Sequence, residues 1–205
     1  GIRLQASGKP RGGAVLLVAN HISWLDILAI NAVHPARFVS KADVRHWPLL
    51  GWLIGAVGTL FIERERKRDA LRVVHQMAQA LDAGDTVAVF PEGTTGDGYA
   101  LLPFHANLLQ AAIATHTPVQ PVAMRYSEPG HAVSPTVAWV GATTLAHSVW
   151  HIAGARGLEV HVQTLDARGS AHADRRALAA VPREDIVEAI GATPPGSQSG
   201  PQTFP

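Results

Sequence analysis

The feature that most constrains the fold of this chain is a series of short apolar runs separated by turns and by segments with helical periodicity. The runs predicted to be strands are Ala14–Ala19, Arg37–Ser40, Thr59–Ile62, Thr86–Phe90, Val119–Arg125, Thr136–Val140 and Leu158–Thr164. Between two of these runs, Asp69–Ala83 carries apolar residues at three- and four-residue intervals and is followed by Gly84, a helix stop signal. This alternation of strands and helices predicts an α/β fold with a mostly parallel sheet flanked by helices.

The size and charge of the chain narrow the classes of protein further. A chain of 205 residues, of which 47% are hydrophobic, can bury one substantial core, so we expect a single domain. Its 17 Lys and Arg residues nearly balance 16 Asp and Glu residues, which excludes a global field that would recruit nucleic acid. The absence of cysteine excludes disulfides, a thiolate nucleophile and cysteine-zinc sites.

The two ends of the chain carry different signals. The chain starts at Gly1 and not at a methionine, which leaves open a preceding signal or membrane anchor. From Gly191 onward the sequence is rich in proline, glycine and serine and offers little apolar surface to offset the entropy of ordering. We therefore expect an ordered domain over residues 1–190 and a disordered tail over residues 191–205.

One apolar segment has features of a membrane surface. The run Leu49–Ile62 is uncharged but shorter than the ~20 residues that a spanning helix needs. Trp47 and Trp52 lie beside or within it, and basic residues follow between positions 64 and 68, an arrangement typical of contact with lipid headgroups. The alternative is an ordinary core segment followed by a solvated charged stretch.

The stretch ANHISWLD is the first candidate for chemistry. If Ala14–Ala19 is a strand and Trp24–Val33 a helix, His21 lies in the turn at the carboxyl end of the strand, where open α/β sheets place their ligands. A nearby carboxylate such as Asp26 can hold an imidazole in one tautomer and stabilise the imidazolium that forms when it takes a proton. Ser23 does not stand in a glycine-flanked nucleophile elbow, so we expect the nucleophile to be a hydroxyl of the substrate.

Taken alone, the pair of His21 and Asp26 also fits a hydrogen bond that only stabilises a turn.

Other histidines of the chain raise the question of a metal site. His147 and His151 are four residues apart in a helix-like stretch, a spacing that can hold zinc. No third ligand lies nearby in the sequence and no HExxH pattern is present, so we predict no metal site.

Three further motifs follow ANHISWLD in order. They are FIER at positions 61–64, FPEGT at positions 90–94 and the proline-bearing strand TPVQPV at positions 117–122. In their order and separation the four motifs resemble the glycerolipid acyltransferase family, which includes lysophosphatidic acid acyltransferases. The resemblance is strong from Val15 to about Arg125 and weaker to about Val162.

The resemblance implies an activity and a catalytic pair. His21 and Asp26 match the catalytic dyad of the family, in which the hydroxyl of an acceptor lysolipid attacks an acyl thioester. The donor is expected to be acyl-CoA or an acyl carrier protein, used as a co-substrate, and no further cofactor is expected. With 1-acyl-glycerol-3-phosphate as acceptor the product is phosphatidic acid. The implied partners are a lysolipid and a membrane surface, and the implied location is the cytoplasmic face of the inner membrane.

The other motifs suggest how the substrates are bound. Arg64 matches the family cation that binds the acceptor phosphate, and a guanidinium can hold phosphate through two hydrogen bonds. Lys41 matches a lysine near the same phosphate. Glu92, Gly93 and Thr94 are implied to line the substrate site, where the glycine permits close backbone approach to an anion.

Pro121 matches a family motif linked to binding of the acyl donor or acyl chain.

The chain departs from the common phosphatidate-forming pattern at several positions. Thr95 and His105 stand where common members carry an arginine and a lysine, and Asp97 adds an acid. This variant resembles the branch that acylates lyso-ornithine lipid, in which Asp97 could pair with a headgroup ammonium. A catalytically silent membrane-surface domain is the alternative from another class, and the intact pair of His21 and Asp26 opposes it.

Overall fold

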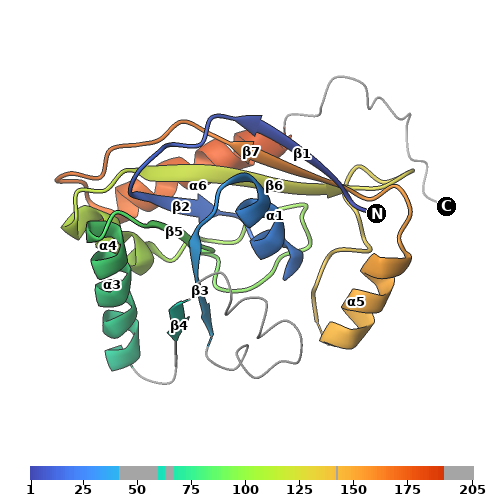
Figure 1. The fold of residues 1–205 in the computed structure, drawn as a ribbon, viewed down its shortest axis with the longest axis horizontal. Coiled ribbons are helices and arrows are strands. Elements are labelled where there is room, and N and C mark those ends of the chain that lie inside the picture. The colour runs from blue at the N-terminus through green and yellow to red at the C-terminus, as the bar shows by residue number, and fades with distance from the viewer. Residues whose placement is uncertain (42–59, 63–66, 142, 192–205) are drawn as a thin grey trace.

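The computed structural model describes residues 1–41, 60–62, 67–141 and 143–191 (Figure 1). The described strands are β1 (Arg3–Gly8), β2 (Val15–Ala19), β3 (Arg37–Lys41), β4 (Leu60–Ile62), β5 (Thr86–Val89), β6 (Val119–Ser127) and β7 (Glu159–Thr164). The described helices are α1 (Leu25–Val33), α3 (Lys67–Asp82), α4 (Gln110–Ala114), α5 (Leu145–Gly154) and α6 (Arg175–Gly191), with a short 3₁₀ helix, η2 (Ala106–Leu109).

The described strands form one sheet in the order β1-β7-β6-β2-β5-β3-β4. The pairs from β6 to β4 are parallel, β7 is antiparallel to β6, and β1 is parallel to β7. The carboxyl ends of β2, β5 and β6 therefore meet at one edge of the sheet. The predicted α/β class and mostly parallel sheet are confirmed.

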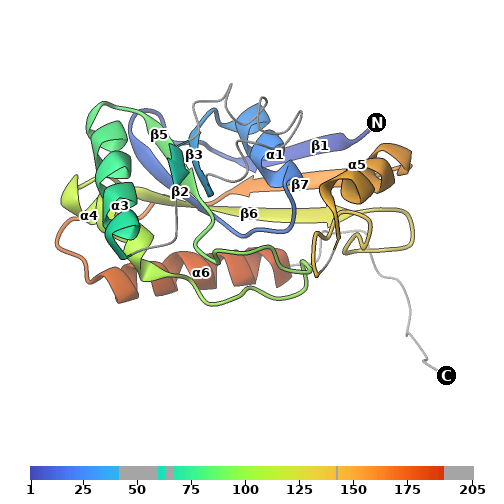
Figure 2. The same cartoon turned by 90° about the horizontal axis from the view of Figure 1, so that it is seen from below.

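The centre of the sheet is buried on both faces. Successive residues of β2 alternate between two apolar clusters: Leu17 belongs to the cluster beneath α1, whereas Leu16 and Val18 pack with α3, α4 and α6. Figure 2 shows α1 and α6 on opposite sides of the sheet. A strand covered on both faces reads as a continuous apolar run, which is why AVLLVA signals a strand without polar alternation.

One predicted strand is wrong. Thr136–Val140 forms a turn followed by irregular chain, although Val137 is fully buried. The segment pairs with no strand of the sheet among the described residues, and the backbone N–H of Trp139 donates instead to the carbonyl oxygen of Ile22, in the turn after β2. Val137 therefore packs in the core from a loop, whereas Val140 at the end of the segment is exposed.

The first strand and the last helix give no clear signal in the sequence. Every residue of β1 is exposed and its sequence RLQASG is largely polar, so its pairing with β7 leaves no hydrophobic signal. Helix α6 contains Pro182, a residue that normally argues against a helix interior.

Other sequence expectations fall outside the part of the chain that the structure describes. The structure does not describe most of the Leu49–Ile62 segment, including Trp52, nor Trp47 and the tail beyond Gly191. The predicted membrane segment and the predicted disordered tail therefore stay predictions. Within the described ranges, no helix is both long enough and apolar enough to cross a bilayer.

Candidate active site

The turn after β2 is tied to β6 by one side chain. The Nδ2 of Asn20 donates to the carbonyl oxygen of Met124 at 3.0 Å, and its Oδ1 accepts from the Met124 N–H at 2.7 Å. In the ladder, Ala19 at the end of β2 pairs with Val122, so β6 continues past the end of its neighbour. The side chain of Asn20 thus extends the pairing by one step and holds the turn that contains His21.

His21 and Asp26 meet in this turn. The Nδ1 of His21 lies 2.8 Å from Oδ2 of Asp26, and the same oxygen accepts the backbone N–H groups of Ile22 at 2.7 Å and Ser23 at 3.0 Å. Asp26 stands in the first turn of α1, where a carboxylate is also stabilised by the helix dipole. The sequence prediction that the two residues form a pair is met by this geometry.

The geometry also selects the tautomer of His21. A carboxylate accepts hydrogen bonds and does not donate them, so the proton of the neutral imidazole is on Nδ1 and the lone pair on Nε2. The Asp26 side chain is fully buried, whereas that of His21 is 19% exposed, and no described residue hydrogen-bonds Nε2. The ring is thereby arranged to accept a proton from a group that enters the site.

The FPEGT motif supports His21 from the other side. The ring of Phe90 stacks on the imidazole with centroids 4.0 Å apart. Glu92 is 5% exposed, and its two oxygens accept the backbone N–H groups of His21 at 2.7 Å and Leu102 at 2.8 Å. The backbone N–H of Gly96 donates to the carbonyl oxygen of His21 at 2.7 Å. Phe90 and Glu92 of the motif therefore hold the ring and the backbone N–H of His21, and Gly96, two residues after the motif, holds its carbonyl oxygen.

Burial has an electrostatic consequence for Glu92. Removal from water raises the pKa of the Glu92 carboxyl, and the backbone hydrogen bonds from Leu102 and His21 oppose that rise. Both oxygens of Glu92 accept backbone N–H groups, and its predicted contact with the substrate stays a prediction.

The remaining predicted residues of the loop lie around this centre. Gly93 has a positive φ of 73°, a conformation that favours glycine. Thr94 and Asp97 are exposed, and Oδ1 of Asp97 accepts the backbone N–H of Tyr99 at 2.9 Å. Pro121 is buried within β6, opposite Val18 of β2. Their roles in substrate binding stay predictions.

The two predicted cations cannot be placed in the site. Arg64 lies outside the described residues, and for Lys41 the structure describes only the backbone, at the end of β3. His147 and His151 lie on α5 with ring centroids 4.1 Å apart, and both are exposed. Among the described residues, no group of three or more histidine, aspartate or glutamate side chains is arranged to hold a metal ion.

One contact of the dyad was not expected from the sequence. Tyr126 lies on the part of β6 that continues past the end of β2. Its hydroxyl donates to Oδ1 of Asp26 at 2.7 Å, and the tyrosine is 1% exposed. The available signal was weak: a tyrosine at the end of the apolar strand that carries Pro121, at the same edge as His21.

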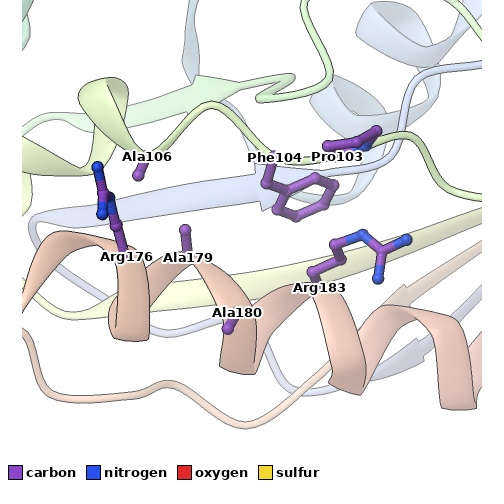
Figure 3. A pocket seen from close by; sticks show the side chains of 7 residues that line it. All are labelled: Pro103, Phe104, Ala106, Arg176, Ala179, Ala180 and Arg183. Carbon is purple, nitrogen blue, oxygen red and sulfur yellow. The ribbon is translucent and has the colours of Figure 1, made fainter.

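A separate pocket of about 330 Å³ lies between α6 and the chain before η2 (Figure 3). Arg176 and Arg183 project into it from α6, and Phe104 lies on the opposite wall. The guanidinium of Arg183 donates to the carbonyl oxygens of Leu101 and Leu102. None of the predicted site residues lines this pocket.

The fold and the site together define an α/β enzyme with a carboxylate-oriented histidine at the carboxyl edge of a mostly parallel sheet. The acyltransferase family model matches residues 3–125, which include the dyad, Glu92 and Pro121. The chain belongs to the acyltransferase family.

Similar proteins include two kinds of lipid acyltransferase. The chain is 37% identical over 198 residues to a lyso-ornithine lipid O-acyltransferase of Pseudomonas aeruginosa, covering 96% of this chain and 75% of that protein. It is 38% identical over 181 residues to a 1-acyl-sn-glycerol-3-phosphate acyltransferase of Neisseria meningitidis, covering 87% of this chain and 68% of that protein.

A solved structure shares the fold. The crystal structure of the 1-acyl-sn-glycerophosphate acyltransferase of Thermotoga maritima matches with a TM-score of 0.62 at 22% identity, over 91% of this chain and 72% of that one. At this identity the match supports the fold alone.

Proposed function

We propose that this protein transfers a fatty acyl group from the thioester of acyl-CoA or of an acyl carrier protein to the free hydroxyl of a lysolipid. The observation that carries this proposal is the geometry of His21, whose Nδ1 is held by buried Asp26 while its Nε2 has no hydrogen bond to any described residue. We further propose that residues 1–190 form the catalytic domain. Membership of the acyltransferase family and the assembled dyad favour an enzyme over a silent binding domain.

The reaction follows from general acid and base chemistry at one ring nitrogen. Nε2 of His21 takes the proton of the acceptor hydroxyl as its oxygen bonds to the thioester carbon. Asp26 stabilises the imidazolium that results. The tetrahedral intermediate then expels the thiolate by breaking the C–S bond, and the imidazolium returns the proton to the departing sulfur. The balance requires only the acyl donor and the acceptor.

The test of this function is a variant of His21. His21→Ala should lower turnover by about 10²- to 10⁴-fold, the usual contribution of a positioned acid or base. Circular dichroism should show an intact fold, and His75→Ala, which alters an exposed histidine on α3, should keep full activity. Near-normal turnover in a folded His21→Ala protein would refute the assignment. Release of free thiol from the donor without any lysolipid would indicate a thioesterase instead.

The leading acceptor that we propose is 1-acyl-glycerol-3-phosphate, giving phosphatidic acid. Its phosphate would be bound by Arg64 and Lys41, which match the cations of the family. The variant loop supports a second acceptor, lyso-ornithine lipid, because Asp97 adds an exposed carboxylate to the loop that begins with Glu92 and Gly93. Similar proteins of both kinds exist.

Four assays separate the two acceptors. Arg64→Ala and Asp97→Asn are each measured with lysophosphatidic acid and with lyso-ornithine lipid. For a phosphate acceptor, Arg64→Ala should cost on the order of 2–4 kcal/mol in kcat/KM, because it removes a charge-assisted contact. With lyso-ornithine lipid as acceptor, Asp97→Asn should lower kcat/KM at least as much as Arg64→Ala does. Small effects of both variants on both lipids would remove these residues from headgroup recognition.

We also propose that the protein acts at a membrane surface, at the cytoplasmic face of the inner membrane. Helix α5 supports contact with lipid: Trp150 on it is 79% exposed and Val149 is 41% exposed, and the helix carries no acidic residue. Its Ser148 accepts a hydrogen bond from Nε1 of Trp24, which lies between His21 and Asp26 in the sequence. An exposed tryptophan on a helix that is hydrogen-bonded to the turn of the proposed site is suited to the boundary between headgroups and acyl chains.

A further inference from the structure

The two oxygens of Asp26 have different partners. Oδ2 accepts hydrogen bonds from His21 Nδ1 and from the backbone N–H groups of Ile22 and Ser23. All three donors belong to the same turn of chain as Asp26. Oδ1 accepts from the hydroxyl of Tyr126, which is 100 residues away in the sequence. Tyr126 is therefore the contact that fixes the carboxylate relative to the sheet.

The position of Tyr126 is itself rigid. It lies on β6 two residues beyond Met124, whose backbone is held by the side chain of Asn20, and it pairs with Val160 on β7. Its carbonyl oxygen accepts the backbone N–H of Ser134 at 2.9 Å. A fully buried ring on a central strand has little freedom to follow movements of α1, so it can serve as a reference point for Asp26.

We propose that Tyr126 is a positioning residue of the acyl transfer reaction, whose hydroxyl orients Asp26 and limits the negative charge that Asp26 presents to His21. This inference rests on the proposed role of His21 as the base. Tyr126 acts through Asp26 and need not touch the substrate. Two effects follow, one on the geometry of the imidazole and one on its electrostatic environment.

The geometric effect concerns the direction of the Nε2 lone pair. With one oxygen held by the turn and the other by β6, the carboxylate plane cannot rotate, and the imidazole that it holds keeps its direction. Small errors in the alignment of a reacting group reduce rates strongly. Loss of the Tyr126 hydroxyl should therefore affect kcat more than the apparent affinity for either substrate.

The electrostatic effect concerns the imidazolium. A hydrogen bond at Oδ1 withdraws charge from the carboxylate, so Asp26 stabilises imidazolium less than an uncapped carboxylate would. Burial and the neighbouring charge of Asp26 raise the pKa of the Tyr126 hydroxyl well above its usual value of 10.0. The phenol consequently keeps its proton and remains a donor at every pH at which the enzyme would be assayed.

The main test is Tyr126→Phe, which removes only the hydroxyl. We expect kcat to fall about 10- to 100-fold with KM for both substrates within about 2-fold. The acidic limb of the pH profile of kcat/KM should move to higher pH by roughly half a unit, because the uncapped carboxylate favours the imidazolium and the base must be neutral to act. An unchanged kcat and an unmoved limb would overturn the inference.

A matched control and a double variant separate positioning from general loss of stability. Ser134→Ala also deletes a buried hydroxyl, on the residue whose backbone N–H bonds to Tyr126. Within the described part of the chain that hydroxyl has no hydrogen-bond partner. The pH profile of kcat/KM of the Ser134→Ala variant should therefore match that of the parent. In an Asp26→Ala background, Tyr126→Phe should have almost no further effect on kcat, because the group through which Tyr126 acts is gone. Multiplied losses in the double variant would show that Tyr126 acts by another route.

A second substitution keeps the test decisive if Tyr126→Phe fails to fold. The chain has 2 tyrosines, and Tyr99 is exposed, so a Tyr99→Phe background allows fluorinated tyrosine to report on Tyr126 alone. A difluorinated ring keeps the hydroxyl but makes it a stronger donor. The acidic limb should then move to lower pH than in Tyr99→Phe with ordinary tyrosine, and a shift in the opposite direction or none would refute the inference. His21→Ala tests the proposed function separately, since its inactivity combined with a normal Tyr126→Phe would reject this inference only.

Discussion

At the scale of single residues, two buried carboxylates organise the site around backbone N–H groups. Asp26 accepts from Ile22 and Ser23 through one oxygen, and Glu92 accepts from His21 and Leu102 through both of its oxygens. Buried carboxylates are costly unless their lone pairs are used in this way. Glu92 thus connects the FPEGT loop to the turn that contains the dyad, and it does so without a partner of opposite charge among these contacts.

The geometry of Glu92 predicts that its amide analogue is a poor substitute. In Glu92→Gln the remaining oxygen can still accept the backbone N–H of His21. The amide nitrogen then faces the backbone N–H of Leu102, and because both groups are donors they cannot form a hydrogen bond. We expect a loss of stability of roughly 1–3 kcal/mol, the usual cost of an unpaired buried polar group, together with reduced kcat. Urea denaturation and steady-state kinetics measure the two effects. A variant as stable and active as the parent would show that neither bond matters.

The raised pKa of Glu92 predicts a pH dependence of stability. Because the folded-state pKa lies above the ordinary value of 4.5, the unfolded chain releases this proton first as the pH rises. The contribution of Glu92 to stability is therefore most favourable at low pH and declines as the pH rises from about 4.5 through the folded-state value. The free energy of unfolding of the parent minus that of Glu92→Gln should decline over this window and level off above it. A difference that grows with pH would contradict the predicted direction.

At the scale of elements, the pairing of the outer strands β1 and β7 requires close backbone approach, whereas the central strand β2 is held by apolar packing on both faces. Gly8 ends β1 with a positive φ of 79°, and it pairs with Thr164 on β7. A Cβ added to Gly8 would overlap the carbonyl oxygen of Thr164. Because that atom belongs to the backbone of a paired strand, it cannot move aside without disturbing the ladder.

This contact predicts a large effect of Gly8→Ala. The combined cost of the left-handed conformation and of the overpacking should destabilise the domain by roughly 2–4 kcal/mol. Gly12→Ala is the matched control, since a Cβ there would have no neighbour within 4 Å. Thermal unfolding of the two variants measures the difference. Equal Tm values would show that β1 can detach from β7 at no cost.

At the scale of the whole molecule, the fold joins the turn that contains the dyad to α5, a helix that exposes Val149 and Trp150. Trp24 follows His21 in the turn and is hydrogen-bonded to Ser148 of α5, while Trp150 on the same helix is exposed. Figure 1 shows α5 standing away from the body of the sheet. For the proposed action at a membrane surface, this contact would join the exposed apolar side chains of α5 to the turn that contains His21.

This arrangement predicts that Trp150 contributes to binding of lipid vesicles. Trp150→Ser should weaken partition into vesicles containing phosphatidylglycerol by roughly 5-fold, as expected for loss of one interfacial aromatic side chain. Turnover of a short-chain acceptor presented in solution should be unchanged. Leu71→Ser removes a similarly exposed apolar residue, 73% exposed on α3, and serves as the control. If both variants partition like the parent, α5 does not face the lipid.

The sequence by itself determined the class of fold, the central strands and the pairing of His21 with Asp26. These depend on local signals: the buried run AVLLVA, the helical periodicity before Gly84, and two residues of one turn only five positions apart. The tertiary structure decided that Glu92 holds the backbone of His21, that Tyr126 holds Asp26, and that Thr136–Val140 is a loop packed against the core. Residues 71 and 100 positions apart make the first two contacts. Such contacts arise only when the carboxyl ends of parallel strands converge at one edge of the sheet, and no periodicity within a single segment of the chain encodes which side chains will meet there.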